Sequence, residues 1–244
     1  MGQASTDIEV LAAKNGRWYK NRSGAWVPSV TSLTGLYPKG EGFDRWLGQA
    51  DSYRDAIEQR DKAAKSGEKI HAACAEHVDK GVVETVGWEE AEVKKLLGFK
   101  RWLKDKGAHI VGAEVPFAAD LYGGRIDFIV EVGGPDGNMY GVVDVKTGTN
   151  VYKSHTIQVV AYAEGIHSIP ELAHMPVSFA IVLHLKSTTN KGYQEHITHC
   201  SNLDWTNTIQ YDVLVGLLRI HRYEYGTEPI MREDKEVPTK VCLS

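Results

Sequence analysis

The chain has 244 residues, 42% of them hydrophobic, enough to bury a sizeable core in one domain. The formal net charge of −4 at pH 7 differs from the basic balance of many nucleic-acid-binding proteins, and no apolar run approaches the ~18 residues of a membrane-spanning helix. The N-terminal segment lacks the basic and apolar regions of a secretory signal, and the three cysteines form no C-x-x-C pair, so we expect a protein of a reducing cytoplasm.

The first half of the chain reads as a hairpin followed by helices. Alternation of apolar and polar residues predicts a hairpin over 17–31 that turns at 21–24. Helical patterns cover 43 to about 79 and 88–106, and Gly107 is the expected C-cap of the second helix. This region is therefore expected to be mainly helical.

The second half alternates strands and helices. Strands are expected near 109–117, 121–132, 140–146, 177–186 and 192–199, with helices over 154–166 and 203–224. Asp204 would lie in the first turn of the last helix, and the charged tail from Gly226 is expected to be extended or mobile.

This order of elements predicts an α/β fold with a central mixed sheet flanked by helices. We expect one domain over 1–225, in which 1–107 form an N-terminal hairpin and helical region and 108–225 form the α/β core. Residues 226–244 would form a separate charged tail.

The stretch GVVDVKTG carries an acid and a base two residues apart. Residues 140–145 are rich in β-branched side chains and follow the turn-like GGPDGN, which predicts the second strand of a hairpin. Alternate residues of a strand share a face, so Asp144 and Lys146 are expected side by side, roughly 7 Å apart. Charges beside a core must be paired or bind a metal, so the motif indicates a strand-end salt bridge or a reactive site.

The preceding strand contains a second acid, Asp127, in GGRIDFIVEV. The hairpin would bring Asp127 and Asp144 within reach of one cation. Two carboxylates this close repel each other unless a divalent ion neutralises both. Oxygen ligands favour Mg²⁺ or Mn²⁺, and the carbonyl of Val145 is a further candidate ligand. Lys146, beside that ion, could orient or help deprotonate a water that attacks a phosphodiester.

Four more polar residues follow an order consistent with such a site. His71 lies in a helical pattern after Gly67, and Glu114 precedes the segment VPF. Taken singly, the first reads as a solvated helix residue and the second as a strand-edge charge. Gln158 and Tyr162 are four residues apart on an expected helix, so the amide and the phenol share a face. A plain helix surface is the alternative interpretation of that pair.

Together these motifs resemble the PD-(D/E)XK nuclease superfamily, and within it the RecB-like exonuclease branch of the phage and mitochondrial genome-maintenance type. The pattern of that branch is G-x-x-x-H, an upstream acid, G-x-x-D, D-x-K-T-G and Q-x-x-x-Y. In this chain it reads Gly67–His71, Glu114, Gly124–Asp127, Asp144–Gly148 and Gln158–Tyr162, all in order. The opening WVPSVTSLTGLYPKG with FDRWL is also similar to the start of these exonucleases.

The resemblance implies a restriction-endonuclease-like core and a role for each matched residue. Those implied as catalytic are Lys146, Asp144, Asp127, Glu114, Gln158 and Tyr162, and those implied as metal ligands are His71, Asp127, Asp144 and Val145. Glu114 would bind a second metal or support the site. Mg²⁺ or Mn²⁺ would polarise the phosphoryl oxygen and lower the pKa of water.

Four residues are expected to contact the substrate: Lys65, Lys69, Arg125 and Thr147. Lys65 and Lys69 recur with Lys62 at helical spacing near the expected histidine ligand. They could line a groove for a phosphate backbone, and a solvated helix face explains the same spacing.

Some members of the branch carry an iron–sulfur cluster on four cysteines, and this chain departs from them. Its cysteines, Cys74, Cys200 and Cys242, are too few and too widely spaced, so no such cluster is expected. The chain also lacks a P-loop of the form G-x-x-x-x-G-K-[ST]. It would act as a stand-alone nuclease or borrow a motor from a partner.

The sequence therefore predicts a metal-dependent DNA exonuclease of a phage or bacterium, working in the cytoplasm in replication, recombination or DNA degradation. Its partner would be single- or double-stranded DNA with an end, and a recombination or single-strand-annealing protein is a second candidate; no membrane partner is expected. Two alternatives stay open: a structure-specific or restriction-type endonuclease, and a catalytically degenerate DNA-binding module.

Overall fold

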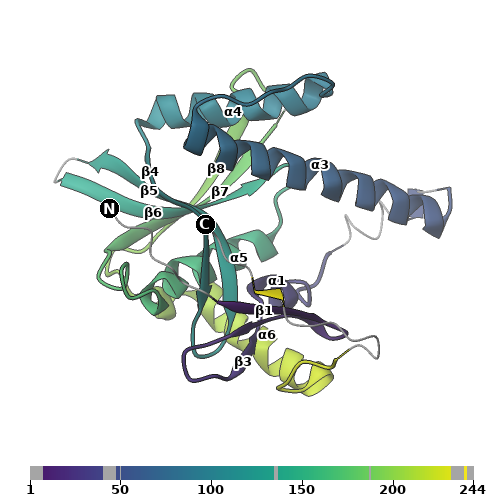
Figure 1. Cartoon of the computed structure of the whole chain (residues 1–244), viewed down its shortest axis with the longest axis vertical. Helices are drawn as coiled ribbons and strands as arrows, with labels where there is room; N and C mark the ends of the chain where they lie inside the picture. The colour runs from purple at the N-terminus through teal and green to yellow at the C-terminus, as the bar shows by residue number, and fades with distance from the viewer. Residues whose placement is uncertain are drawn as a thin grey trace.

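The computed structural model describes residues 8–40, 48–49, 51–134, 137–186, 188–231 and 239–240. The fold is α/β, with a five-stranded sheet that carries helices on both faces (Figure 1). Its strands are β4 (His109–Ala118), β5 (Gly123–Gly134), β6 (Gly137–Lys146), β7 (Val177–Leu185) and β8 (Tyr193–His199), in the spatial order β4-β5-β6-β7-β8. The expected mixed sheet flanked by helices is confirmed.

The sheet is mixed because β6 and β7 run parallel while the other neighbouring pairs are antiparallel. Parallel neighbours need a crossover connection, and α5 (Lys153–Gly165), followed by the 3₁₀ turn η1 (Ile166–Ser168), supplies it. Every residue from Ile157 to Ala163 is buried, because α5 packs against β7 on one side and α6 (Ile209–Tyr225) on the other. A helix with apolar residues on all sides is typical of such an enclosed position.

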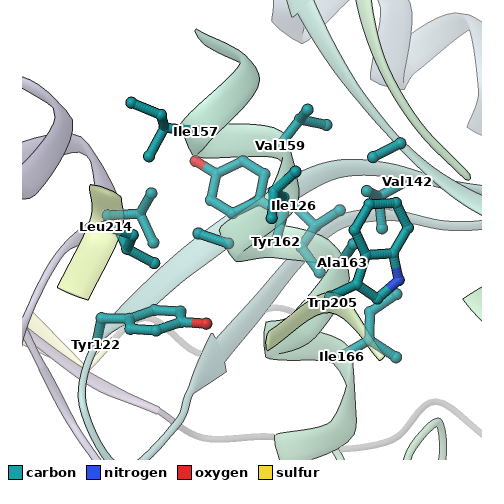
Figure 2. Close-up of a cluster of buried hydrophobic side chains, with 14 of the residues drawn as sticks. Tyr122, Ile126, Val142, Ile157, Val159, Tyr162, Ala163, Ile166, Trp205 and Leu214 are labelled. Atoms are coloured by element: carbon teal, nitrogen blue, oxygen red, sulfur yellow. The ribbon is translucent and has the colours of Figure 1, made fainter. Parts of the chain in front are cut away.

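Two hydrophobic clusters hold the helices to opposite faces of the sheet. On one face, α3 (Tyr53–Lys80) and α4 (Glu90–Lys106) pack on side chains such as Phe128 and Val143. On the other face, α1 (Val30–Thr34), α5 and α6 share a cluster that includes Ile126, Tyr162 and Trp205 (Figure 2). The end of β6 therefore lies between two packed layers.

A second, smaller sheet has the order β3-β2-β1-β9. It consists of β1 (Glu9–Ala13), β2 (Gly16–Lys20), β3 (Trp26–Pro28) and β9 (Thr239–Lys240). The predicted hairpin is confirmed as β2 and β3, whereas β1 and the short α1 were not expected. A parallel bridge between Ser29 and Gly123 joins the end of this hairpin to the start of β5. This bridge places the small sheet beside the end of the main sheet at which β5 begins.

Helix ends follow local capping signals. Gly107 ends α4 in the left-handed region (φ 57°), with its N–H bonded to the carbonyls of Leu103 and Lys104, as expected. Ser52 caps α3, so this helix begins at Tyr53; residues 43–47 of the expected helical stretch lie outside the described part of the chain.

The prediction of a helix over 203–224 is wrong at its start. Asp204 accepts a bond from the N–H of Thr206 and caps a separate 3₁₀ turn, η2 (Trp205–Asn207). Thr208 is extended (φ −122°) and caps α6, which begins only at Ile209. Two capping residues, Asp204 and Thr208, therefore divide a segment that periodicity alone predicts as one helix.

The described part of the tail returns to the start of the chain. Asn15 bonds to the backbone of Tyr225, Glu228 and Ile230, and β9 pairs with β1. Residues 232–238 and 241–244, including Cys242, lie outside the described residues.

In the part of the chain that the structure covers, no helix combines the length and the apolar character needed to cross a membrane.

Candidate metal site

Three carboxylates lie at one level across three neighbouring strands. Ala113 pairs with Phe128 and Val115 with Ile126, so Glu114 of β4 lies opposite Asp127 of β5. Phe128 pairs with Val143, so Asp144 of β6 lies on the other side of Asp127. Directly opposed residues of neighbouring strands share a face. The predicted closeness of Asp127 and Asp144 follows from this register.

His71 of α3 completes a group of candidate ligands. Its Nδ1 lies 3.2 Å from Oδ2 of Asp127. His71, Glu114 and Asp127 each offer one ligand atom, and these atoms all lie within 4.8 Å of one another. Glu114 has a φ of 53°, a conformation that costs free energy for a residue with a side chain and that often marks functional sites.

Asp144 lies in a hydrogen-bonded network beside that group. The Lys146 ammonium donates to its Oδ1 at 3.1 Å and lies 2.8 Å from its Oδ2. Gln158 of α5 donates to the same Oδ1 at 3.1 Å and to the Tyr162 hydroxyl at 2.8 Å. The spacing of Gln158 and Tyr162 therefore places both in one buried network, not on a free helix surface.

Asp144 and Val145 lie beside this tight group of candidate ligands and are not part of it. The tight group of candidate ligands contains Glu114 and leaves out Asp144. Val145 contributes its N–H, which donates to Oδ2 of Asp127 at 2.8 Å, while its side chain packs in the cluster beneath α3 and α4. Asp144 thus stands next to the group, between it and Lys146.

The two central acids titrate in opposite directions. For Asp127, burial favours the neutral form, but the His71 hydrogen bond, the His71 and Lys146 charges and the Val145 N–H outweigh it, so the pKa is lowered. For Asp144, burial dominates, Lys146 offsets it only in part and Asp127 adds to it, so the pKa rises to about 6. Asp127 therefore loses its proton at a lower pH than Asp144.

The outer members of the group have raised pKa values. Burial raises the pKa of Glu114, and the Arg125 charge opposes this only in part. Burial acts to lower the pKa of His71, but the hydrogen bond and charge of Asp127 outweigh it and raise that pKa. Both groups therefore retain protons more readily than in water, and a cation would displace those protons.

The residues present fit a divalent cation. The donor set is two carboxylates and one imidazole, with a third carboxylate adjacent, which suits Mg²⁺ or Mn²⁺. Oδ2 of Asp144 is fully buried, and no described residue gives it a well-aligned hydrogen bond, although the Lys146 ammonium is near. A buried carboxylate oxygen in that state has capacity left for a cation.

The site opens into a cavity of about 150 Å³. Its lining includes Arg17, Tyr19, Ser29 and Thr31, none of which the sequence singled out. Ser29 is identifiable as the N-cap of α1 in the run SVTS, but no local signal points to Arg17. Arg17 is exposed, and its guanidinium forms no hydrogen bond or ion pair with any residue that the structure describes.

The four residues expected to contact substrate have different surroundings. Arg125 lines the cavity and pairs with Glu114 (Nε–Oε2 2.8 Å). Thr147 contacts α3, where a Cβ at Gly67 would lie 3.1 Å from its Oγ1. Lys69 binds Glu92 of α4 and lies 4.3 Å from the centre of the Trp88 ring, so it joins two helices. Lys65 is exposed on α3.

The sequence matches no protein-family model, and no curated protein matches it significantly.

Proposed function

We propose that the chain is a divalent-metal-dependent DNA exonuclease with a PD-(D/E)XK-type core of the RecB-like branch. The observation that carries the proposal is the alignment of Glu114, Asp127 and Asp144 on three adjacent strands, with Lys146 two residues beyond Asp144 and His71 above Asp127. Five short sequence motifs that are far apart in the chain supply this one site.

Each side chain has a role that its contacts support. His71, Glu114 and Asp127 would hold the cation, with Asp144 as an additional ligand. Gln158 fixes Oδ1 of Asp144, and Asp144 in turn holds the Lys146 ammonium at the cavity. Lys146 would orient a water or take part in its deprotonation.

The remaining chemistry belongs to the cation and the phosphate. A divalent ion provides electrophilic assistance at the phosphoryl group and lowers the pKa of water. Arg17, on β2, adds a positive charge to the lining of the same cavity, which suits an anionic substrate. We propose further that the enzyme works on DNA ends in the cytoplasm of a bacterium or phage-infected cell, in replication, recombination or degradation.

Digestion of end-labelled linear DNA beside covalently closed circular DNA, with Mg²⁺, Mn²⁺ or EDTA, tests the proposal. Linear DNA should disappear only with metal, and Lys146→Ala should lower the rate by about 100-fold or more, the scale of a lost acid–base group. Lys153→Ala, which removes an exposed lysine at the start of α5, is the matched control and should match the wild type.

Other outcomes would redirect the assignment. Cutting of circles would identify an endonuclease. DNA binding without cutting in either metal would identify a degenerate binding module. A Lys146→Ala protein as active as the wild type would refute the site assignment.

A further inference from the structure

A second polar hollow lies on the α4 side of the main sheet, outside the candidate metal site. We name it the α4 groove; it has a volume of about 560 Å³ and lies between α4 and the turn that joins β7 to β8. The side chains on its helix side include Lys94, Leu97 and Arg101, which are three or four residues apart and therefore share one face. The turn between β7 and β8 contributes the lining residues on the opposite side, Thr188 to Gly192.

The charge of the α4 groove is one-sided. Three of its nine lining residues, Lys94, Arg101 and Lys191, are basic and none is acidic, in a chain whose net charge is −4. All three basic side chains are exposed. Two threonines and an asparagine add hydroxyl and amide groups, so the lining offers hydrogen-bond donors and positive charge together.

The basic side chains keep capacity for an anion. Arg101 uses one N–H, Nη1, on the carbonyl of Asn190 at 2.7 Å, which holds the guanidinium beside the turn. Lys191 lies 5.9 Å from the centre of the Tyr193 ring, and no acidic residue of the described chain pairs with it. Lys94 pairs with Glu90 at 2.7 Å, but both side chains are exposed, and such pairs are weak.

The α4 groove belongs to the same edge of the sheet as the candidate metal site. β6 and β7 are parallel and Lys146 pairs with His184, so the turn after β7 begins at the edge where Lys146 ends β6. Lys95 of α4 donates to the carbonyl of Thr147 at 2.8 Å, which ties the helix to the residue that follows Lys146. The candidate site and the α4 groove therefore both lie at the end of the sheet where β6 and β7 finish.

We infer that the α4 groove binds the sugar–phosphate backbone of the DNA strand at a distance from the bond that is cut. This inference rests on the proposed function, and it adds that substrates must extend beyond the reacting nucleotides to bind well. The occupant is a polyanion, because three exposed cations line a hollow without any acidic wall.

The test compares two double variants that lose the same charge. Arg101→Gln/Lys191→Gln alters the groove, and Arg219→Gln/Arg222→Gln alters two exposed arginines of α6, on the other face of the sheet. Substrates are single-stranded oligonucleotides of about 4 and about 30 nucleotides, at the lower limit of and well beyond the roughly 4–16 nucleotides that one single-strand-binding domain covers. Bis(p-nitrophenyl) phosphate reports the chemistry alone.

For the groove variant we expect KM on the long oligonucleotide to rise by about fivefold or more with kcat unchanged. The dependence of log kcat/KM on log salt should weaken by about 1.4, which is about 0.7 for each lost phosphate contact on single strands. Rates on the short oligonucleotide and on bis(p-nitrophenyl) phosphate should not change, and the α6 variant should match the wild type throughout.

Equal KM values for the two variants on the long substrate would overturn the inference, as would an equal loss on bis(p-nitrophenyl) phosphate. If the wild type cuts neither these oligonucleotides nor linear duplex DNA, the proposed function fails, and fluorescence anisotropy with the long oligonucleotide in EDTA then decides the groove alone. Weaker binding by the groove variant would support it. A wild type that binds a polyglutamate peptide as tightly as DNA would assign the groove to an acidic protein segment instead.

Discussion

At the scale of single residues, the candidate metal site is held in a state that is unfavourable without a cation. Asp127 is ionised, Asp144 has a pKa of about 6 because of burial, and Oδ2 of Asp144 has no well-aligned donor. Stored electrostatic cost of this kind is typical of sites that bind an ion or a substrate, because the ligand relieves it.

Metal binding should therefore become tighter as pH rises. The pKa of Asp144 is about 6 and that of His71 is raised above its ordinary 6.5, so Asp144 is protonated below about pH 6 and His71 stays protonated to a higher pH than a free imidazole; both must release those protons when the cation binds. Affinity should increase from about pH 5 and level off above about pH 8, by at most about tenfold per pH unit for each proton displaced. Calorimetry with Mn²⁺ at several pH values measures this.

Repeating the titration in buffers of different ionisation enthalpy counts the protons released. Asp144→Asn should lower that count by up to one near pH 6, because the amide carries no proton to displace. An affinity that stays flat between about pH 5 and about pH 8 would contradict the assigned protonation states.

Strand spacing selected the central residues, whereas the outer ones, Glu114 and His71, were selected only through the resemblance to a known motif pattern. Asp127, Asp144 and Lys146 were found because strand alternation fixes their common face. Glu114 enters the tight group through a register of ten-residue strands and a left-handed φ of 53°, neither of which a sequence pattern records. Arg17 reaches the cavity only because the small sheet docks beside β5, a contact between distant segments.

At the scale of elements, the position of α3 on the end of β6 sets where His71 lies. Gly67 is one turn before His71, and a Cβ there would lie 3.1 Å from Oγ1 of Thr147. Glycine costs about 1 kcal/mol in a helix relative to alanine, so close packing is the physical reason for it here.

Gly67→Val should push α3 away from β6 and displace His71. We expect Mn²⁺ affinity to fall by about tenfold or more, since displacements of about 1 Å at a site have effects of this size or larger. Calorimetry measures the loss. Gly216→Val is the control, because Gly216 also lies in a helix but a Cβ there meets nothing within 4 Å.

Removal of the opposing side chain makes this prediction specific. In Gly67→Val/Thr147→Ala the hydroxyl that meets the new side chain is absent, so part of the affinity should return. A double variant no better than Gly67→Val, or a Gly216→Val protein with the same loss, would show that helix packing on β6 does not control the ligand.

Elements were predictable where periodicity and capping agree, and not where they conflict. α4 with Gly107, β5 and β6 have clear patterns and appear close to the expected bounds. The start of α6 was misplaced because Asp204 and Thr208 are both good capping residues, and only tertiary packing of Trp205 decides between them.

At the scale of the whole molecule, the two ends of the described chain are joined. One side chain, Asn15, contributes several of these contacts: its amide donates to the carbonyls of Tyr225 (3.0 Å) and Glu228 (2.9 Å). Its Oδ1 accepts from the Ile230 N–H (2.8 Å) and from the Trp18 indole (3.1 Å). The three contacts with the segment after α6 each bridge more than 200 positions of sequence, which no local pattern predicts.

Asn15→Ala should therefore release the segment after α6 and loosen the small sheet that carries Arg17. A hydrogen bond contributes roughly 1 kcal/mol net, and an orphaned buried donor costs about 1–3 kcal/mol, so we expect a loss of about 2–4 kcal/mol in the free energy of unfolding. Urea unfolding measures that loss. Limited proteolysis should show faster cleavage between Gly226 and Met231.

Asn21→Ala is the matched control, since Asn21 is as buried but its side chain bonds only to Ser23 and Ala25 within its own turn. It should cost less stability and leave cleavage after α6 unchanged. If Asn15→Ala and Asn21→Ala were cleaved equally fast, the join between the ends would contribute nothing of its own. If only Asn15→Ala were cleaved faster, the contacts between the two ends of the chain would hold β2 in place. Because β2 forms one wall of the candidate site, these contacts would then help to shape the cavity that a substrate would enter.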